Sequence, residues 1–98
     1  MDRESSAEIR VSVKYYNIVA DFVGRREERR GVAAGATIRD LMRTLATEST
    51  SFQKLAFTTE GQVSGHVRLF RNGQAVMDLD EPLVEGDEMR VFPTISGG

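Results

Sequence analysis

Residues 37–48 have the apolar spacing of an amphipathic helix, and they lie between segments that alternate like strands. Thr37 is a typical N-cap residue, and Asp40 in the first turn favours the positive end of the helix dipole. A helix with one apolar face needs a sheet or another helix to cover that face, which narrows the folds available to this chain. The apolar side chains, at positions i, i+3, i+4 and i+7, are Ile38, Leu41, Met42 and Leu45.

The other patterned segments predict a sheet. Residues 9–16 alternate between apolar and polar side chains, as a half-buried strand does. Asn72-Gly73 tolerates the positive φ angles of a tight hairpin and separates two further strands. Pro93 follows the last apolar run and should stop its ladder. The expected strands are residues 9–16, 25–30, 67–71, 75–79 and 89–92.

The run at residues 25–30 reads Arg-Arg-Glu-Glu-Arg-Arg. One interpretation is a solvated edge strand whose charges prevent pairing with other chains. The alternative is a site for phosphate or for a partner. Two glutamates among the arginines favour the edge strand.

Two segments are harder to read. Residues 18–23 are apolar and end at Gly24, which suits a helical turn or a loop. Residues 52–66 give little pattern: Phe52, Leu55 and Phe57 form a short apolar segment, and a loop should follow. His66 lies at the edge of that loop, and the sequence assigns it no role.

The order of elements predicts an α+β fold, with one main helix across one face of a mixed sheet of four to five strands. The first and last strands should lie side by side in the middle, and if they are parallel the chain ends lie at opposite ends of the sheet. We expect a disordered N-terminal tail at residues 1–8, one domain at residues 9–93 and a flexible C-terminal tail at residues 94–98.

Composition narrows the function. The chain has no cysteine and one histidine, which argues against thiolate chemistry and a protein-bound metal. A net charge of −2 gives no general attraction to nucleic acid or to an anionic membrane. The polar start is unlike a signal peptide, so we expect a cytoplasmic protein.

The C-terminal third resembles the sulfur-carrier branch of the ubiquitin-like (β-grasp) proteins (MoaD/ThiS type), which includes archaeal small modifier proteins. The resemblance rests on Asn72-Gly73, Pro82-Leu83, Glu85-Gly86-Asp87-Glu88, Val91-Phe92-Pro93 and the final Gly97-Gly98. It is strongest to the small subunit of molybdopterin synthase, covers residues 9–98 and is loose at 52–66.

The resemblance implies a carrier protein and not an enzyme in its own right, although such a chain serves as the small subunit of molybdopterin synthase. A ubiquitin-activating-type adenylating enzyme (MoeB/ThiF-like) would use ATP to adenylate Gly98, and a thiocarboxylate would follow. Sulfur would then pass to the molybdopterin synthase large subunit or to another sulfur-accepting enzyme. In modifier members the activated carboxylate is joined to lysines of target proteins.

The residues agree with a partner-dependent tail. The chain has no G-x-x-x-x-G-K-[ST] phosphate loop, so it would bind no cofactor and leave ATP to the partner. Gly97 and Gly98 have no side chains, so a narrow channel could close around them. The six residues from Pro93 to Gly98 reach roughly 20 Å when extended.

Strand alternation also predicts a binding face. If the apolar positions of the strands face the helix, then Tyr16, Phe70 and Phe92 face outward, with Arg68 and Arg90 as a polar rim and Pro93 leading to the tail. A contiguous exposed aromatic cluster marks an interface. The alternative is that loops partly bury these rings.

Three functions stay open: a sulfur carrier, a protein modifier joined through Gly98, and an interaction module without tail chemistry.

Overall fold

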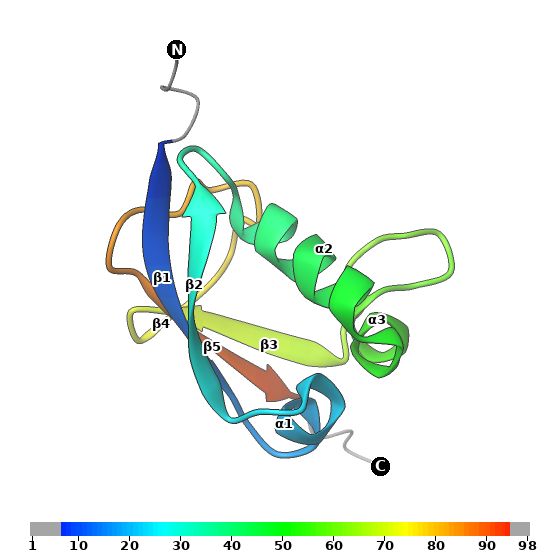
Figure 1. Ribbon diagram of the computed structural model, residues 1–98. Helices are drawn as coiled ribbons and strands as arrows, with labels where there is room; N and C mark the ends of the chain where they lie inside the picture. Colours follow the sequence, from blue (N-terminus) through cyan, green and yellow to red (C-terminus); the bar gives the residue numbers. More distant parts are fainter. Residues whose placement is uncertain (1–6, 95–98) are drawn as a thin grey trace.

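The computed structural model describes residues 7–94 and confirms the α+β, β-grasp arrangement (Figure 1). Within these residues, five strands form one mixed sheet in the order β2-β1-β5-β3-β4, and α2 is the longest of three helices. The elements are β1 (Glu8–Tyr15), α1 (Ile18–Val23), β2 (Glu27–Ala33), α2 (Ile38–Glu48), α3 (Thr50–Ala56), β3 (Val67–Arg71), β4 (Gln74–Ala75) and β5 (Glu88–Pro93).

The first and last strands are neighbours, as the sequence predicts. β1 and β5 pair in parallel, with Ser12 opposite Glu88 and Tyr15 opposite Val91. β2 pairs with β1 and β3 pairs with β5, and both of these pairs are antiparallel. Because β1 and β5 run in the same direction, β1 begins at one end of the sheet and β5 finishes at the other (Figure 1).

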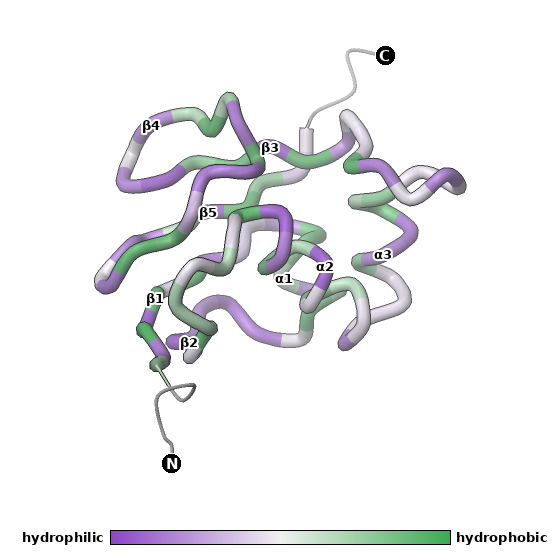
Figure 2. The backbone as a smooth tube through the Cα atoms, turned by 90° about the horizontal axis from the view of Figure 1, so that it is seen from above, coloured by the Kyte–Doolittle hydropathy of each residue, from purple (hydrophilic) through white to green (hydrophobic). Residues whose placement is uncertain are grey.

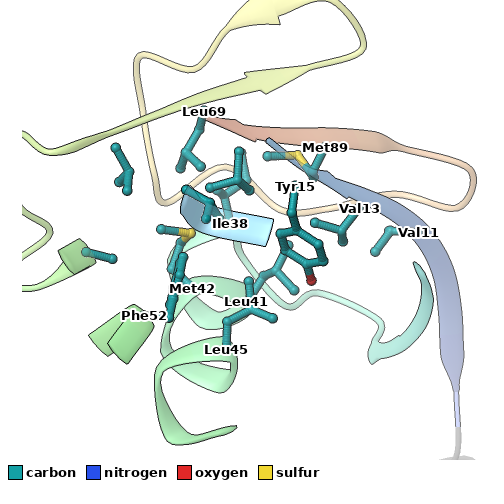
Figure 3. Close-up of a cluster of buried hydrophobic side chains, with 14 of the residues drawn as sticks. Val11, Val13, Tyr15, Ile38, Leu41, Met42, Leu45, Phe52, Leu69 and Met89 are labelled. Carbon is teal, nitrogen blue, oxygen red and sulfur yellow. The ribbon is translucent and has the colours of Figure 1, made fainter. Parts of the chain in front are cut away.

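The apolar face of α2 covers the sheet, and the side chains of the two layers point toward one another (Figure 3). Residues Ile38 and Met42 are at most 1% exposed, as are Val13 and Met89 on the strands. Thr37 and Asp40 form a capping box: the Asp40 N–H donates to Thr37 Oγ1, and the Thr37 N–H donates to Asp40 Oδ2. The helix therefore begins where the sequence predicts.

A third helix replaces the poorly patterned start of residues 52–66. α3 follows α2 directly, because Ser49 ends one helix and caps the next. The Phe52 N–H donates to Ser49 Oγ (3.1 Å), and the Ser49 hydroxyl donates to the Phe22 carbonyl of α1 (2.7 Å). Phe52 is fully buried in the core. Seen from above, α2 and α3 lie side by side (Figure 2), whereas α1 lies at the end of the sheet beside the end of β5 (Figure 1).

β4 is shorter than expected, because the chain leaves the sheet after Ala75. The segment after it supplies the carbonyls that α2 needs at its N-terminus. The Arg39 N–H donates to Leu79 O (2.8 Å), and the Ile38 N–H donates to Glu81 O (3.1 Å). The first N–H groups of a helix have no acceptor within the helix, and this segment supplies acceptors for two of them. It therefore bonds to α2 instead of extending the strand.

The Asn72-Gly73 hairpin forms as predicted, with φ angles of 51° and 87°. Behind it, Asp87 is 2% exposed and accepts hydrogen bonds from Asn72 Nδ2 (3.0 Å), Arg71 Nε (3.0 Å) and the Val84 N–H (2.8 Å). Burial alone would raise the Asp87 pKa, but these donors outweigh it and lower the pKa. This carboxylate ties the hairpin to the segment before β5.

We predict that Asp87→Asn lowers the free energy of unfolding by about 1.5 kcal/mol. The substitution removes the negative charge that accepts hydrogen bonds from Arg71, while the Arg71 guanidinium remains beside it. Urea unfolding followed by circular dichroism measures this. Glu85→Gln, at an exposed position two residues earlier, is the matched control and should change stability by less than about 0.5 kcal/mol. Equal stability of wild type and Asp87→Asn would contradict the structural role of Asp87.

The charge run lies in and beside edge strand β2, so the edge-strand interpretation is confirmed. One side of it also forms a polar network that the sequence does not show. The buried Tyr15 hydroxyl donates to Glu28, and Arg30 bridges Glu28 (2.9 Å) and Glu48 of α2. Burial of Glu28 would raise its pKa, but its hydrogen bonds with Tyr15, Arg30 and Arg25 lower the pKa overall.

A lowered pKa means that ionised Glu28 stabilises the folded state, and that this contribution is lost as the pH falls through the folded-state pKa. We predict that Glu28→Gln is less stable than wild type at pH 7 and that the difference shrinks as the pH falls below the ordinary carboxyl value of 4.5. Parallel chemical unfolding of both proteins across this range measures it. The other carboxylates titrate in both proteins, so their effects cancel when the two free energies of unfolding are subtracted. A difference that stays constant at all pH values would contradict this role of Glu28.

No helix in the part of the chain that the structure describes is long and apolar enough to cross a membrane.

Candidate partner-binding face

The side of the sheet away from the helices carries a cluster of three aromatic rings. Tyr16 stacks on Phe92 with ring centroids 4.1 Å apart and an interplanar angle of 10°. Phe70 meets Phe92 edge to face, at 5.5 Å and 83°. Each of the three side chains is half-buried. We call this cluster, with Arg68 and Arg90, the aromatic face.

Strand pairing brings these side chains together. In β3 and β5, Arg68 is opposite Phe92 and Phe70 is opposite Arg90. Tyr16 comes directly after β1, and its N–H donates to Val91 O (3.1 Å), so its ring lies beside Phe92. Their neighbours in the chain, such as Leu69 and Val91, are buried on the helix side. The placement on the outer side thus follows from the alternation in the sequence, and the role in binding stays a prediction.

Charges surround the rings. Arg68 is exposed, and Arg90 Nη2 lies 3.2 Å from Glu88 Oε1. Lys14 Nζ lies 3.2 Å from the other oxygen of Glu88. The Glu88 pKa is lowered, first by its hydrogen bond with the Lys14 ammonium and also by the charge of Arg90. These effects outweigh desolvation, which alone would raise the pKa. Lys14 shares its side of β1 with Tyr16 by strand alternation, whereas Glu88 precedes the expected last strand and was not among the predicted site residues.

Arg90 also has an unused donor. Within residues 7–94, the Arg90 Nε atom is buried and has no hydrogen-bond partner, although 40% of the whole side chain is exposed. Lys14, Arg68 and Arg90 lie in this region with Glu88, and Glu27 of β2 lies opposite Lys14, so cations and carboxylates are mixed around the rings.

The end of β5 is held more firmly than the sequence suggests. Pro93 still belongs to the strand, one residue beyond the expected end, and pairs with Val67. The Thr94 N–H donates to His66 O (3.0 Å), and its hydroxyl donates to Gly65 O (3.1 Å). His66, to which the sequence assigned no role, therefore holds the start of the tail through its backbone. The predicted site residues Gly97 and Gly98 lie outside the described residues.

Two open hollows flank this region. One, of about 500 Å³, lies beside Tyr16 and is lined by Lys14, Asn17 and Arg26 among others. The other, of about 410 Å³, lies along β3 and is lined by Val67, Met77 and Thr94 among others. Within residues 7–94, no group of three histidine, cysteine or acidic side chains could hold a metal ion.

Comparison with known proteins gives a consistent family. A sequence model of the ThiS family matches residues 13–98. Small archaeal modifier protein 1 of Haloferax volcanii is 32% identical over 85 residues, which is 87% of this chain and 97% of the relative. The crystal structure of that modifier from the same organism superposes with a TM-score of 0.80 at 30% identity, covering 91% of this chain and 99% of the other.

A second similar structure is that of a molybdopterin converting factor subunit. A Pyrococcus furiosus chain assigned as subunit 1 of molybdopterin converting factor superposes with a TM-score of 0.74 at 28% identity. The match covers 89% of this chain and 99% of that chain. The small archaeal modifier and the molybdopterin converting factor subunit thus share one fold with this protein over nearly its whole length.

Proposed function

This chain belongs to the ThiS family of small ubiquitin-like carrier and modifier proteins, and we propose that it acts as a sulfur carrier. Its C-terminal Gly98 would be adenylated by a partner enzyme and converted to a thiocarboxylate. The thiocarboxylate would then donate sulfur in the assembly of the molybdenum cofactor. The similarity to molybdopterin converting factor subunit 1 supports this assignment.

The chemistry explains why two partners are needed. A carboxylate is a poor electrophile until one oxygen becomes part of a good leaving group, and attack of the Gly98 carboxylate on the α-phosphorus of ATP supplies that group with release of pyrophosphate. Attack of sulfide on the carbonyl carbon of the acyl-adenylate then breaks the bond to AMP, and loss of the sulfur-bound proton leaves the thiocarboxylate. This chain has no phosphate loop of its own, so ATP would bind to the adenylating enzyme.

The observation that carries the proposal is the aromatic face beside the end of β5. Phe92, at the centre of the three rings, immediately precedes Pro93 and the anchored Thr94. A partner seated on this face would find the tail leaving at a fixed point and in a fixed direction. The same face would serve first the adenylating enzyme and then the molybdopterin synthase large subunit or another sulfur acceptor.

A second function is favoured by one observation, the 32% identity to a small archaeal modifier protein. In that case an amine of a target protein, in place of sulfur, would attack the activated Gly98. The two functions share the activation step and differ in the nucleophile.

Intact-mass spectrometry of the protein from its source cells tests both. Replacement of one oxygen by sulfur at the C-terminus supports the carrier, and adducts heavier by whole proteins support the modifier. Protein that stays unmodified, even in cells that synthesise molybdenum cofactor, would overturn the carrier proposal.

A further inference from the structure

The hollow of about 410 Å³ beside β3 opens because the strand that covers this edge is short. β4 pairs with Phe70 and Arg71 at the end of β3, and beyond them the Val76 N–H donates to Leu69 O (2.9 Å). Within residues 7–94, the edge of β3 before Leu69 therefore has no neighbouring strand. The lining is mostly apolar and includes Val63, Val67, Leu69, Val76, Met77 and Leu79.

The side chains around this hollow are less well covered than the rest of the core. Val67 and Leu69 are 9% and 8% exposed, whereas the other buried apolar side chains of residues 7–94 are at most 3% exposed. Met77, which also lines the hollow, is 91% exposed. A cavity of roughly 150 Å³ already accepts a benzene molecule, so this hollow has room for a large apolar side chain.

The end of β5 leads directly to the hollow. β4 lies beside the end of β3, whereas the end of β5 lies beside its start (Figure 1). Thr94 is one of the lining residues. Its N–H donates to His66 O (3.0 Å), which continues the antiparallel pairing of Val67 with Pro93 by one step. The backbone therefore reaches the hollow in the register of the sheet.

The next residue, Ile95, has the one large apolar side chain among the last four residues of the sequence. It lies outside the part of the chain that the structure describes. Consecutive Cα atoms are about 3.8 Å apart, so Ile95 starts within reach of the hollow that Thr94 lines. One further step of the register sets Ile95 opposite Gly65. A β-carbon on Gly65 would have no neighbouring atom within 4 Å, so the space there is open.

Strand alternation gives Ile95 a matching direction. Side chains two residues apart in a strand share a face, so a continued β5 turns Ile95 to the helix side together with Val91. The side chains of Val67 and Leu69 lie on that same side. A tail that turned into solvent instead would leave both the isoleucine and the hollow in contact with water, which is the less favourable arrangement.

We propose that the hollow beside β3 is the docking site of Ile95, and that the chain thereby holds its own tail against the domain one residue beyond Thr94. Ser96, Gly97 and Gly98 are then the residues that project, with a reach of roughly 10 Å when extended. A partner would meet a short tail whose base is fixed. The inference concerns the chain by itself and does not depend on activation of Gly98, so it and the proposed function can fail separately.

NMR spectroscopy of the full-length chain with labelled methyl groups tests the contact directly. We expect nuclear Overhauser effects from the Ile95 δ1 methyl to methyl groups of Leu69 and Met77, independent of protein concentration. In urea unfolding, Ile95→Ser should lower the folding equilibrium constant about tenfold, because a buried isoleucine side chain is lost. Ser96→Ala, one residue later in the tail, is the matched control and should leave the constant unchanged within about twofold.

A second substitution shows whether Ile95 acts through the hollow. Met77→Ser alters the lining without touching the tail, so it should lower the folding constant about threefold in the wild type and leave it unchanged in the Ile95→Ser background. Additive effects, unchanged stability of Ile95→Ser, or no Overhauser effect from Ile95 to the lining would each overturn the proposal. So would Overhauser effects that arise only between differently labelled molecules, since they would put the tail of a second copy in the hollow.

Discussion

One residue appended after Gly98 should abolish ATP–pyrophosphate exchange with the adenylating enzyme. The proposed reacting group is the terminal carboxylate itself, and an added residue converts it into an amide and moves the new carboxylate about 3.5 Å further along the chain. Misplacement of a reacting group by even a few ångströms removes most of the advantage of holding it near its reaction partner. The measurement is the exchange rate of the extended and native chains at equal concentration.

Two controls separate chemistry from folding. The extended chain should keep its free energy of unfolding within about 0.5 kcal/mol, because the addition follows Gly98 and leaves the hydrogen bonds of Thr94 unchanged. It should also compete with the native chain for the enzyme, since the aromatic face is unchanged. Exchange at the native rate by the extended chain would refute the role of the Gly98 carboxylate.

The parts of the fold that the sequence predicts are those set by local chemistry. The capping box of Thr37 and Asp40 fixes the start of α2, and the tolerance of Asn72 and Gly73 for positive φ fixes the hairpin. Period-two alternation sorts β1, β3 and β5 into buried and outward positions, because side chains of a strand point to opposite faces. These features need no knowledge of the rest of the molecule.

The features that were missed depend on partners distant in sequence. α3 exists because Ser49 caps it and binds the Phe22 carbonyl, 27 residues away. β4 ends early because the carbonyls of Leu79 and Glu81 satisfy the N-terminus of α2, which lies about 40 residues earlier. The residue patterns do not show such pairings, so the sequence predicted only a short apolar segment at Phe52, Leu55 and Phe57, and a longer strand at residues 75–79.

The candidate site divides in the same way. Parity placed Tyr16, Phe70 and Phe92 on one side of the sheet, and the pairing register then made them touch. The sequence could not reveal that they stack or that they are half-buried, because both facts depend on the register. The anchor of Thr94 on His66 was also hidden, since it is made by backbone atoms.

Phe92→Ala should weaken binding to the adenylating enzyme at least tenfold, about 1.4 kcal/mol or more, because central aromatic side chains carry much of the energy of an interface. Its half-buried ring also contacts Tyr16 and Phe70, so the free energy of unfolding should fall by about 1 kcal/mol. The chain would remain folded, and a binding titration at a temperature well below the melting point isolates the loss of affinity.

Phe52→Ala is the matched control, because it removes the same ring from a fully buried site on the helix side. It should cost about 3–5 kcal/mol of stability, while the protein that stays folded binds with nearly native affinity. A large loss of affinity with a small loss of stability in Phe92→Ala, and the reverse in Phe52→Ala, would identify the aromatic face as a docking surface. If Phe92→Ala instead loses stability like Phe52→Ala and binds normally when folded, Phe92 serves the fold and not the partner.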